Sequence, residues 1–280
     1  MSLFEFKQVD VFSTVALKGN PVAVVLNADS LTDEQMADFA RWTNLSETTF
    51  VLKPQNPKAD YRLRIFTTLC ELPFAGHPTL GSCHAWLEAG GKPRGEEIIQ
   101  ECAVGLIRIR RNAEQLAFTA PPLLRSGPVD DALLHRVCRG LGLEQHEVKQ
   151  ARWVDNGPGW LALLLADRER VLSLKPDYAQ LLGLALGVVA PWTPERDGDE
   201  AQFEVRAFLA GDGMQEDPVT GSLNAGLAQW LIADGLAPPR YVASQGTAMG
   251  RAGRVLIEQV GQDIWVGGAA VTCISGTVSL

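Results

Sequence analysis

Cysteines are few in this chain, and they form no pattern typical of a metal site or a disulfide framework. The five thiols stand at positions 70, 83, 102, 138 and 273, an odd and scattered set without a C-x-x-C pair. Disulfide-stapled secreted domains and zinc sites use closely spaced cysteines. We therefore expect a soluble protein of the reducing cytoplasm that binds no metal.

Positive charge and long apolar runs are also scarce. With 25 lysines and arginines against 33 aspartates and glutamates, the formal net charge is −8. Nucleic-acid binders usually carry a basic patch, so we expect no nucleic-acid partner. The longest apolar run, about residues 181–192, is interrupted by glycine and proline and is too short to cross a bilayer. The first residues do not resemble a secretory signal, so we expect no membrane partner either.

Glycine-rich nucleotide-binding motifs are missing as well. The sequence contains neither a P-loop nor a G-x-G-x-x-G fingerprint, and we expect no nucleotide cofactor. The chain has 280 residues, of which 46% are hydrophobic. That length and composition fit about two globular domains, each with its own core.

An internal repeat is the strongest pattern that is present. ELPFAGHPTLG starts at Glu71 and EDPVTGSLNAG at Glu216, an offset of 216 − 71 = 145, and Gln100 and Gln245 keep the same spacing. Ordered similarity at one offset is typical of a duplicated structural unit. We interpret it as one ancestral lobe used twice, the alternative being chance similarity between two Gly-Pro turns.

Each copy of the repeat predicts a nearly uncharged, buried helix. Glycines end the two helices at 90–91 and at Gly235, and Ser222 is expected to be the N-cap of the second. Each helix also has an internal glycine at the matched position, Gly81 and Gly226. Glycine costs about 1 kcal/mol relative to alanine inside a helix, so its recurrence predicts that something packs closely there.

Short strands surround these two helices, which predicts an α+β fold. We expect two pseudo-symmetric lobes, each a barrel-like, mostly antiparallel sheet around a central helix. Two amphipathic helices complete the pattern, one with a capping box at Thr32 and one capped by Asp130. Pro121-Pro122 marks the linker. The expected strands of the first lobe are 4–10, 22–26, 48–53, 60–66, 105–111 and 115–119.

Four polar residues become interesting only as a group. Taken singly, each has an ordinary structural interpretation. Glu47 would be a solvated loop residue, and Asp217 would start a turn. Ser222 would be a helix cap, and His77 would be a cap or a core histidine. However, His77 and Ser222 occupy equivalent places in the repeat, and Asp217 lies five residues before Ser222. If the lobes pack about a pseudo-twofold axis, one cleft would hold a histidine, two carboxylates and a hydroxyl. Such a set can move a proton on an anionic substrate.

Several segments resemble the phenazine-biosynthesis PhzF-like family. They are GNPVAVV at 19–25, NLSETTFV at 44–51, RIFT with ELPFAGHPTLG at 64–81, and EDPVTGS at 216–222. The resemblance implies a diaminopimelate-epimerase-like fold whose C-terminal strand, about 270–280, returns to the first lobe. The expected domains are therefore 1–120 with about 270–280, and 121–269, with the active site in the cleft between them.

The resemblance also implies residue roles. The family's best-known member isomerises trans-2,3-dihydro-3-hydroxyanthranilate without cofactor or metal. By resemblance Glu47 is the acid/base, and His77, Asp217 and Ser222 are its supporting polar residues. Gly76 would offer a backbone contact to the substrate.

A small anionic substrate fits the ends of the two central helices. Helix N-termini carry unsatisfied N–H groups and a partial positive charge. Gly76 and Gly221 stand just before them, where backbone can approach a ligand. We expect the substrate carboxylate to lie between these termini.

Two rival functions stay open from the sequence. Related epimerases and racemases use a cysteine ahead of each central helix, and the matching positions here are Ala75 and Thr220. This argues against a two-thiol racemase, but an epimerase that uses Glu47 instead remains an alternative. The other is a non-catalytic small-molecule binder of the same fold. We further expect a homodimer.

Overall fold

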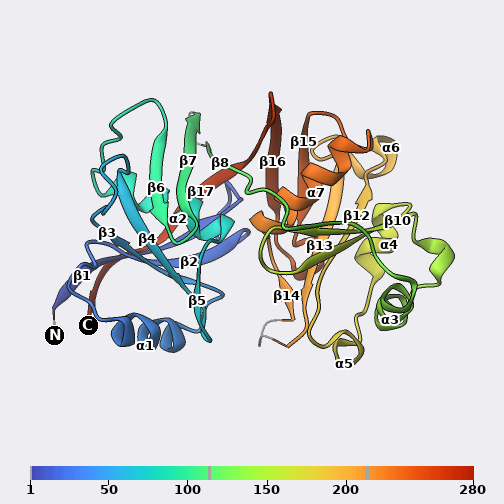
Figure 1. The fold of residues 1–280 in the computed structure, drawn as a ribbon, viewed down its shortest axis with the longest axis horizontal. Helices are drawn as coiled ribbons and strands as arrows, with labels where there is room; N and C mark the ends of the chain where they lie inside the picture. The colour runs from blue at the N-terminus through green and yellow to red at the C-terminus, as the bar shows by residue number, and fades with distance from the viewer. Residues whose placement is uncertain (1, 113–114, 212–214) are drawn as a thin grey trace. The chain divides into compact units, whose positions relative to one another are not determined.

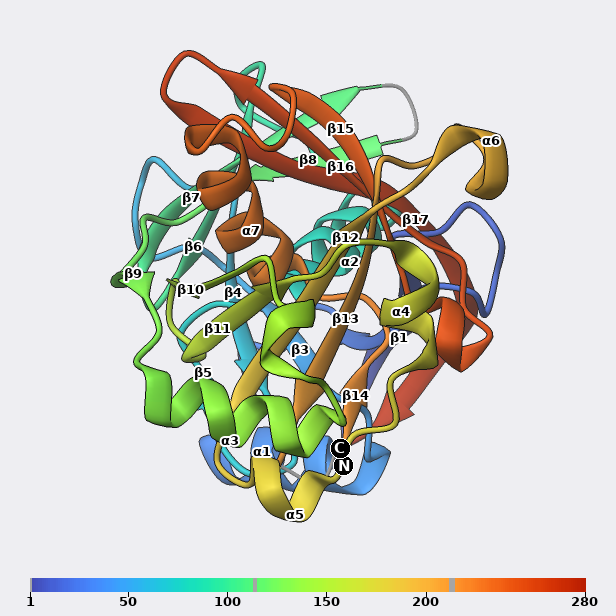
Figure 2. The ribbon, with the colours of Figure 1, turned by 90° about the vertical axis from the view of Figure 1, so that its right-hand side faces the viewer.

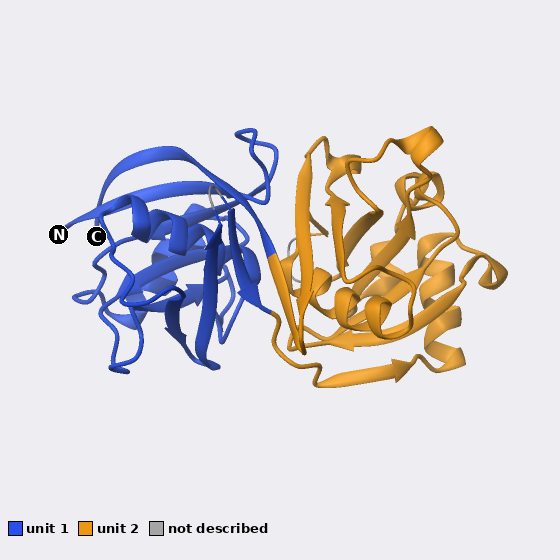
Figure 3. Ribbon diagram, turned by 90° about the horizontal axis from the view of Figure 1, so that it is seen from above, with its two compact units in different colours: residues 1–119, 267–280 blue, residues 120–266 orange. Residues whose placement is uncertain are grey.

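The computed structural model describes residues 2–112, 115–211 and 215–280. Its contacts divide the chain into two compact units (Figure 3). Unit 1 comprises Met1–Thr119 and Gly267–Leu280, and unit 2 comprises Ala120–Val266. The strand β17 (Asp263–Ser279) carries the chain out of unit 2 and back into unit 1.

Unit 1 is a closed ring of eight strands (Figure 1). β1 pairs with both β2 and β17, and pairing continues through β3, β4, β6, β7 and β8 to the other edge of β17. The β2–β3 and β4–β6 pairs are parallel, whereas the pairs β1–β17, β1–β2, β3–β4, β6–β7 and β7–β8 are antiparallel. A mostly antiparallel barrel is thus confirmed. Besides β17, the strands of this ring are β1 (Leu3–Val11), β2 (Asn20–Val25), β3 (Thr48–Leu52), β4 (Tyr61–Phe66), β6 (Ile98–Cys102), β7 (Gly105–Asn112) and β8 (Gln115–Thr119).

The helix α2 (Gly76–Glu88) packs against the ring on β1, β2, β3, β4 and β8. A Cβ added to Gly81 would lie 2.4 Å from Val22 Cγ1 and 3.0 Å from Val11 Cγ2. The close packing predicted from this internal glycine is therefore confirmed. It lets the helix approach β1 and β2 more closely than any side chain would permit.

A second helix, α1 (Asp33–Thr43), packs against β3 and β4. Its capping box is confirmed, because Thr32 Oγ1 accepts from the Gln35 N–H while the Gln35 side chain accepts from the Thr32 N–H. Its buried side chains join Phe4, Val25, Phe50 and Phe66 in one apolar cluster. The C-terminus of this helix leads directly into the loop that carries Glu47.

Unit 2 repeats the pairing order of unit 1. From β10 to β16 the successive pairs are antiparallel, parallel, antiparallel, parallel and antiparallel, as they are from β1 to β7. Its helix α7 (Gly221–Ala233) has 13 residues like α2 and packs on β10, β11 and β16. The predicted duplication is confirmed. The strands are β9 (Arg125–Pro128), β10 (Gln150–Asp155), β11 (Trp160–Leu164), β12 (Ala185–Pro191), β13 (Phe203–Leu209), β15 (Arg240–Gln245) and β16 (Gly253–Val260).

A matched ion pair holds the short strand that precedes each central helix. In unit 1 Arg64 on β4 pairs with Glu71 on β5 (Glu71–Leu72) at 2.7 Å. In unit 2 Arg206 on β13 pairs with Glu216 on β14 (Glu216–Asp217) at 2.8 Å. Each guanidinium also lies about 5 Å from the phenylalanine ring two residues further along its strand. The loops entering α2 and α7 are therefore anchored in the same way.

The remaining helices cover unit 2, and one sequence prediction about capping is wrong. Asp130 caps α3 (Asp131–Leu141) as predicted, and α3 lies beside α5 (Tyr178–Leu181) (Figure 2). The short helices α4 (Arg168–Ser173) and α6 (Pro194–Asp197) were not predicted. Ser222 is not the N-cap of α7, because the helix already begins at Gly221. No helix among the described residues is long and apolar enough to cross a membrane.

Candidate active site

In unit 1 the predicted site residues Glu47 and His77 form a pair. Glu47 lies in the loop between α1 and β3, and His77 is the second residue of α2. Glu47 Oε2 is 3.2 Å from His77 Nε2, and the two side chains are 15% and 5% exposed. The two atoms are in contact but are not aligned as a hydrogen bond. Catalytic hydrogen bonds are often loose in a free enzyme and tighten when substrate binds.

His77 is a neutral imidazole in this environment. Burial lowers the pKa of His77 to about 3, and a hydrogen bond that the protonated ring makes to the Pro21 carbonyl opposes this only in part. Nδ1 lies 3.3 Å from Asn20 Nδ2. An amide nitrogen only donates, so this contact favours the tautomer with its hydrogen on Nε2. The ring then presents an N–H, not a charge, to Glu47.

Neighbouring hydroxyl groups fix the strand that follows Glu47. Thr49 Oγ1 is 2.8 Å from Ser82 Oγ on α2 and 3.1 Å from the Ala23 carbonyl on β2. Both hydroxyl-bearing residues are fully buried. The start of β3 is thereby tied both to the central helix and to the neighbouring strand, which limits the movement of the Glu47 backbone.

In unit 2 the predicted site residues lie around Asp217, at the end of β14. Its carboxylate Oδ2 accepts a hydrogen bond of 2.6 Å from Thr220 Oγ1, and its side chain is largely buried. Gln245 completes the network from β15, donating from Nε2 to Thr220 Oγ1 and to the Asp217 carbonyl. Gln245 also accepts from the Thr220 N–H at 3.0 Å. The loop before α7 is therefore fully ordered by hydrogen bonds.

Ser222 lies in the first turn of α7, directly after Gly221. Its hydroxyl accepts a hydrogen bond of 2.9 Å from the indole Nε1 of Trp160. Its carbonyl accepts one of the same length from Asn156 Nδ2. Its oxygen is thus turned toward Trp160, and the N-cap position of the helix belongs to Thr220.

The N-termini of both central helices lack a side-chain cap. Ala75 and Thr220, the N-cap residues of α2 and α7, make no capping hydrogen bond. The first helical residues are Gly76 and Gly221, which bring no side chain to cover the backbone amides. Such amides can bind an anion.

Each unit therefore assembles three of the six predicted site residues. Glu47, His77 and Gly76 lie together in unit 1, and Asp217, Gly221 and Ser222 lie within one short segment of unit 2. The sequence did not identify Asn20, Asn156 or Trp160 as contributors. The sequence identified Gln245 only as the repeat partner of Gln100. That shared spacing was a signal for its role, because Gln100 also donates a hydrogen bond to its own central helix, at Thr79.

The cysteines do not stand at the two helix N-caps. Burial raises the pKa of Cys83, within α2, to about 12. In the described part of the chain, no group of three histidine, cysteine, aspartate or glutamate side chains could hold a metal ion.

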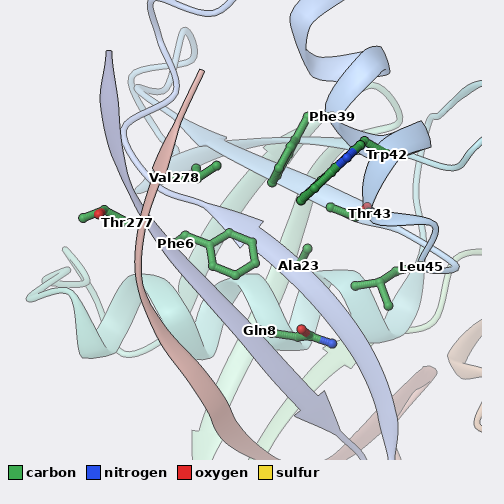
Figure 4. Close-up of a pocket in the computed structure, with 9 residues that line it drawn as sticks. All are labelled: Phe6, Gln8, Ala23, Phe39, Trp42, Thr43, Leu45, Thr277 and Val278. Carbon is green, nitrogen blue, oxygen red and sulfur yellow. The ribbon is translucent and has the colours of Figure 1, made fainter. Parts of the chain in front are cut away.

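A separate pocket of about 420 Å³ lies on unit 1 where α1 ends (Figure 4). The indole of Trp42 beside it is 79% exposed and stacks on Phe39 at 6.1 Å. None of the six predicted site residues lines this pocket, so it is not part of the candidate site. Its lining residues are Phe6, Gln8, Ala23, Phe39, Trp42, Thr43, Leu45, Thr277 and Val278.

Known proteins are similar to this chain over its whole length. Residues 9–276 match the family model described as phenazine biosynthesis-like protein. Antisense-enhancing sequence 1 of Schizosaccharomyces pombe is 38% identical, with 99% of each chain covered. The trans-2,3-dihydro-3-hydroxyanthranilate isomerase of Pseudomonas fluorescens is 32% identical, covering 97% of this chain and 98% of its own.

Solved structures agree with this similarity. A PhzF-family phenazine biosynthesis protein of Enterococcus faecalis superposes with a TM-score of 0.82 at 26% identity, covering 100% of both chains. A probable proline racemase from Agrobacterium radiobacter has a TM-score of 0.61 at 13% identity, covering 99% of this chain and 93% of its own. The second likeness concerns the fold alone. The predicted diaminopimelate-epimerase-like architecture is confirmed.

Proposed function

The chain belongs to the phenazine biosynthesis-like family and is an isomerase, and from this premise we propose that it moves a proton on a small cyclic carboxylic acid without a cofactor. The observation that carries the proposal is the Glu47–His77 pair. A carboxylate held 3.2 Å from a neutral, buried imidazole is suited to accept a proton and return it.

Glu47 is the acid/base in this proposal. Its carboxylate takes a proton from one carbon of the substrate, the electron pair of the broken C–H bond forms a new double bond, and the pair of the neighbouring double bond moves to a second carbon. The carboxylic acid so formed delivers the proton to that second carbon, so no redox partner is required. His77, donating from Nε2, stabilises the carboxylate form and keeps it directed at the substrate.

In this proposal unit 2 also carries groups that can bind a substrate. Asp217, held by Thr220 and Gln245, accepts hydrogen bonds from polar groups of the substrate. The uncapped amides at Gly221, with the Ser222 hydroxyl, are donors for its carboxylate, and the uncapped amides at Gly76 in unit 1 are donors of the same kind. Similarity to trans-2,3-dihydro-3-hydroxyanthranilate isomerases at 31–32% identity supports a ring-bearing substrate of that kind.

Proton NMR in deuterated buffer tests the proposal. The wild-type protein is incubated with trans-2,3-dihydro-3-hydroxyanthranilate and with a panel of cyclic and amino-acid-like carboxylates. We expect one cyclic compound to isomerise with deuterium entering at one ring carbon, equally after dialysis against a chelator. Exchange at a stereocentre with racemisation would instead support the epimerase alternative. No exchange with any compound would contradict catalysis.

We also propose a cytoplasmic homodimer. The cysteines stay unpaired, which fits a reducing compartment. The largely exposed indole of Trp42 supports a contact with a second copy. Sedimentation equilibrium of the wild-type protein and of Trp42→Ala measures the oligomeric state, and a monomeric wild type would contradict the proposal.

A further inference from the structure

Hydrogen bonds and two glycines fix the backbone conformation of the loop between β10 and β11. Asp155 Oδ1 accepts hydrogen bonds of 2.7 Å from the N–H groups of both Gly157 and Gly159. Those glycines have φ angles of 143° and 86°, which other residues rarely adopt. The loop therefore holds Asn156 and Trp160, at its two ends, in fixed positions.

Both of these residues contact Ser222 on α7. Asn156 Nδ2 donates to the Ser222 carbonyl, and Trp160 Nε1 donates to the Ser222 hydroxyl, each at 2.9 Å. The close approach of α7 to β10 makes these contacts possible. It depends on Gly226, one turn beyond Ser222, where an added Cβ would lie 2.2 Å from the Val154 carbonyl oxygen.

The bond from Trp160 gives the Ser222 hydroxyl a direction. An indole N–H can only donate, so the serine oxygen must accept. The hydroxyl hydrogen is then left for a different partner, and it donates to no residue in the part of the chain that the structure describes. Ser222 is only half-buried and lies in the first turn of an uncapped helix. Its hydrogen and the free helix amides are thus donors at the same helix end.

We propose that Trp160 is a positioning residue that, by donating to the Ser222 oxygen, directs the Ser222 hydroxyl hydrogen toward an anionic oxygen of the substrate. This inference rests on the proposed function, since it assigns the carboxylate recognition of that same site. Without the indole donor, the hydroxyl could rotate and accept from the substrate instead, so selectivity for a carboxylate over a neutral amide would fall. Trp160 acts through Ser222 and does not itself touch the substrate.

Calorimetric binding of 2-aminobenzoate and 2-aminobenzamide tests this inference without turnover. The two ligands differ in the charge of one group. Hydrogen bonds to a charged group contribute about 1.5–3 kcal/mol, so Ser222→Ala should weaken binding of the carboxylate about 10- to 100-fold. Trp160→Phe keeps most of the ring and should weaken it about 3- to 10-fold, with little change for the amide.

A double variant and a matched control decide between a positioning role and a packing role. In the Ser222→Ala background, Trp160→Phe should have no further effect, because Trp160 acts only through that hydroxyl. Trp230→Phe removes another buried indole donor, which bonds to Asp234 at the other end of the same helix. This control should bind both ligands as the wild type does.

Three results would overturn the inference. They are additive losses in the double variant, an unchanged carboxylate preference in Trp160→Phe, or a wild type without that preference. If Trp160→Phe does not fold, the indole N–H resonance of Trp160 decides the matter, since Ser222→Ala must shift it and Trp230→Phe must not. Ligand binding without any isomerisation would count against the proposed function but leave this measurement intact.

Discussion

Replacement of Gly226 by alanine should destabilise unit 2, although alanine is the better helix former. On helix propensity alone the change gains about 1 kcal/mol. The new Cβ, however, would lie 2.2 Å from the Val154 carbonyl oxygen and 3.2 Å from its carbonyl carbon. Backbone atoms of a central strand cannot rotate away, so α7 and β10 must separate by roughly 1 Å to restore ordinary contact.

The expected size of the effect follows from these opposing terms. Overpacking of a dense core costs typically 1–3 kcal/mol, and a rigid carbonyl places this site at or beyond the upper limit. After subtraction of the gain of about 1 kcal/mol in helix propensity, we expect the free energy of unfolding to fall by about 2 kcal/mol. Urea unfolding followed by far-UV circular dichroism measures it. The melting temperature should fall by about 4–8 °C. The displaced helix should also weaken the Trp160–Ser222 bond, and with it the affinity for 2-aminobenzoate.

Two other glycines provide the comparison. At Gly81 the added Cβ would meet side-chain methyl groups of Val22 and Val11 instead of a backbone carbonyl, and side-chain atoms can shift more than the backbone of a strand, so Gly81→Ala should cost less than Gly226→Ala. At Gly276 no atom lies within 4 Å of the added Cβ, and Gly276→Ala should be neutral within about 0.5 kcal/mol. A Gly226→Ala protein as stable as the wild type would refute the close-approach argument.

Three further predictions concern the chemistry. Glu47→Gln should lower turnover, measured by NMR exchange, about 10²- to 10⁴-fold without loss of stability. The exposed control Glu96→Gln should keep full activity. Thiol alkylation should leave activity, because Cys83 is buried with its pKa raised to about 12 and no cysteine stands at either helix N-cap; stoichiometric inactivation with substrate protection would revive a thiol mechanism. The lowered pKa of His77 means that the unfolded chain binds a proton between about pH 6.5 and 3 that the folded chain does not. Stability should therefore fall as the pH drops through this window, by at most about 1.4 kcal/mol per pH unit, and His77→Gln should flatten the slope.

The sequence predicted those features that leave a periodic or repeated trace. The offset of 145 residues located both central helices, and the matched glycines Gly81 and Gly226 predicted their close packing before any contact was known. The capping box at Thr32 was equally readable, because its interactions span only three residues. Local and repeated constraints are thus visible in a single chain.

Contacts between distant segments could not be read in the same way. Trp160 and Ser222 are separated by 62 positions, and nothing in the spacing links an indole at the start of a strand to a hydroxyl on a helix. The prediction of Ser222 as an N-cap was wrong because serine next to an apolar helix is a capping signal, whereas α7 already begins at Gly221. Asn20 likewise gave no sign of its contact with His77, 57 positions away.

The path of β17 has a consequence for the order in which the chain can fold. The first strand, β1, pairs on one edge with residues 270–279, so the ring of unit 1 cannot close until nearly the whole chain has left the ribosome. In unit 2 the strand pairs from β9 to β16 lie within residues 120–266 and use none of those last residues. The usual N-to-C sequence of domain folding during synthesis is thereby inverted. Unit 2, although it is synthesised later, can form these strand pairs first, while one edge of β1 stays unpaired. Any delay in translation after residue 266 prolongs the exposure of that edge.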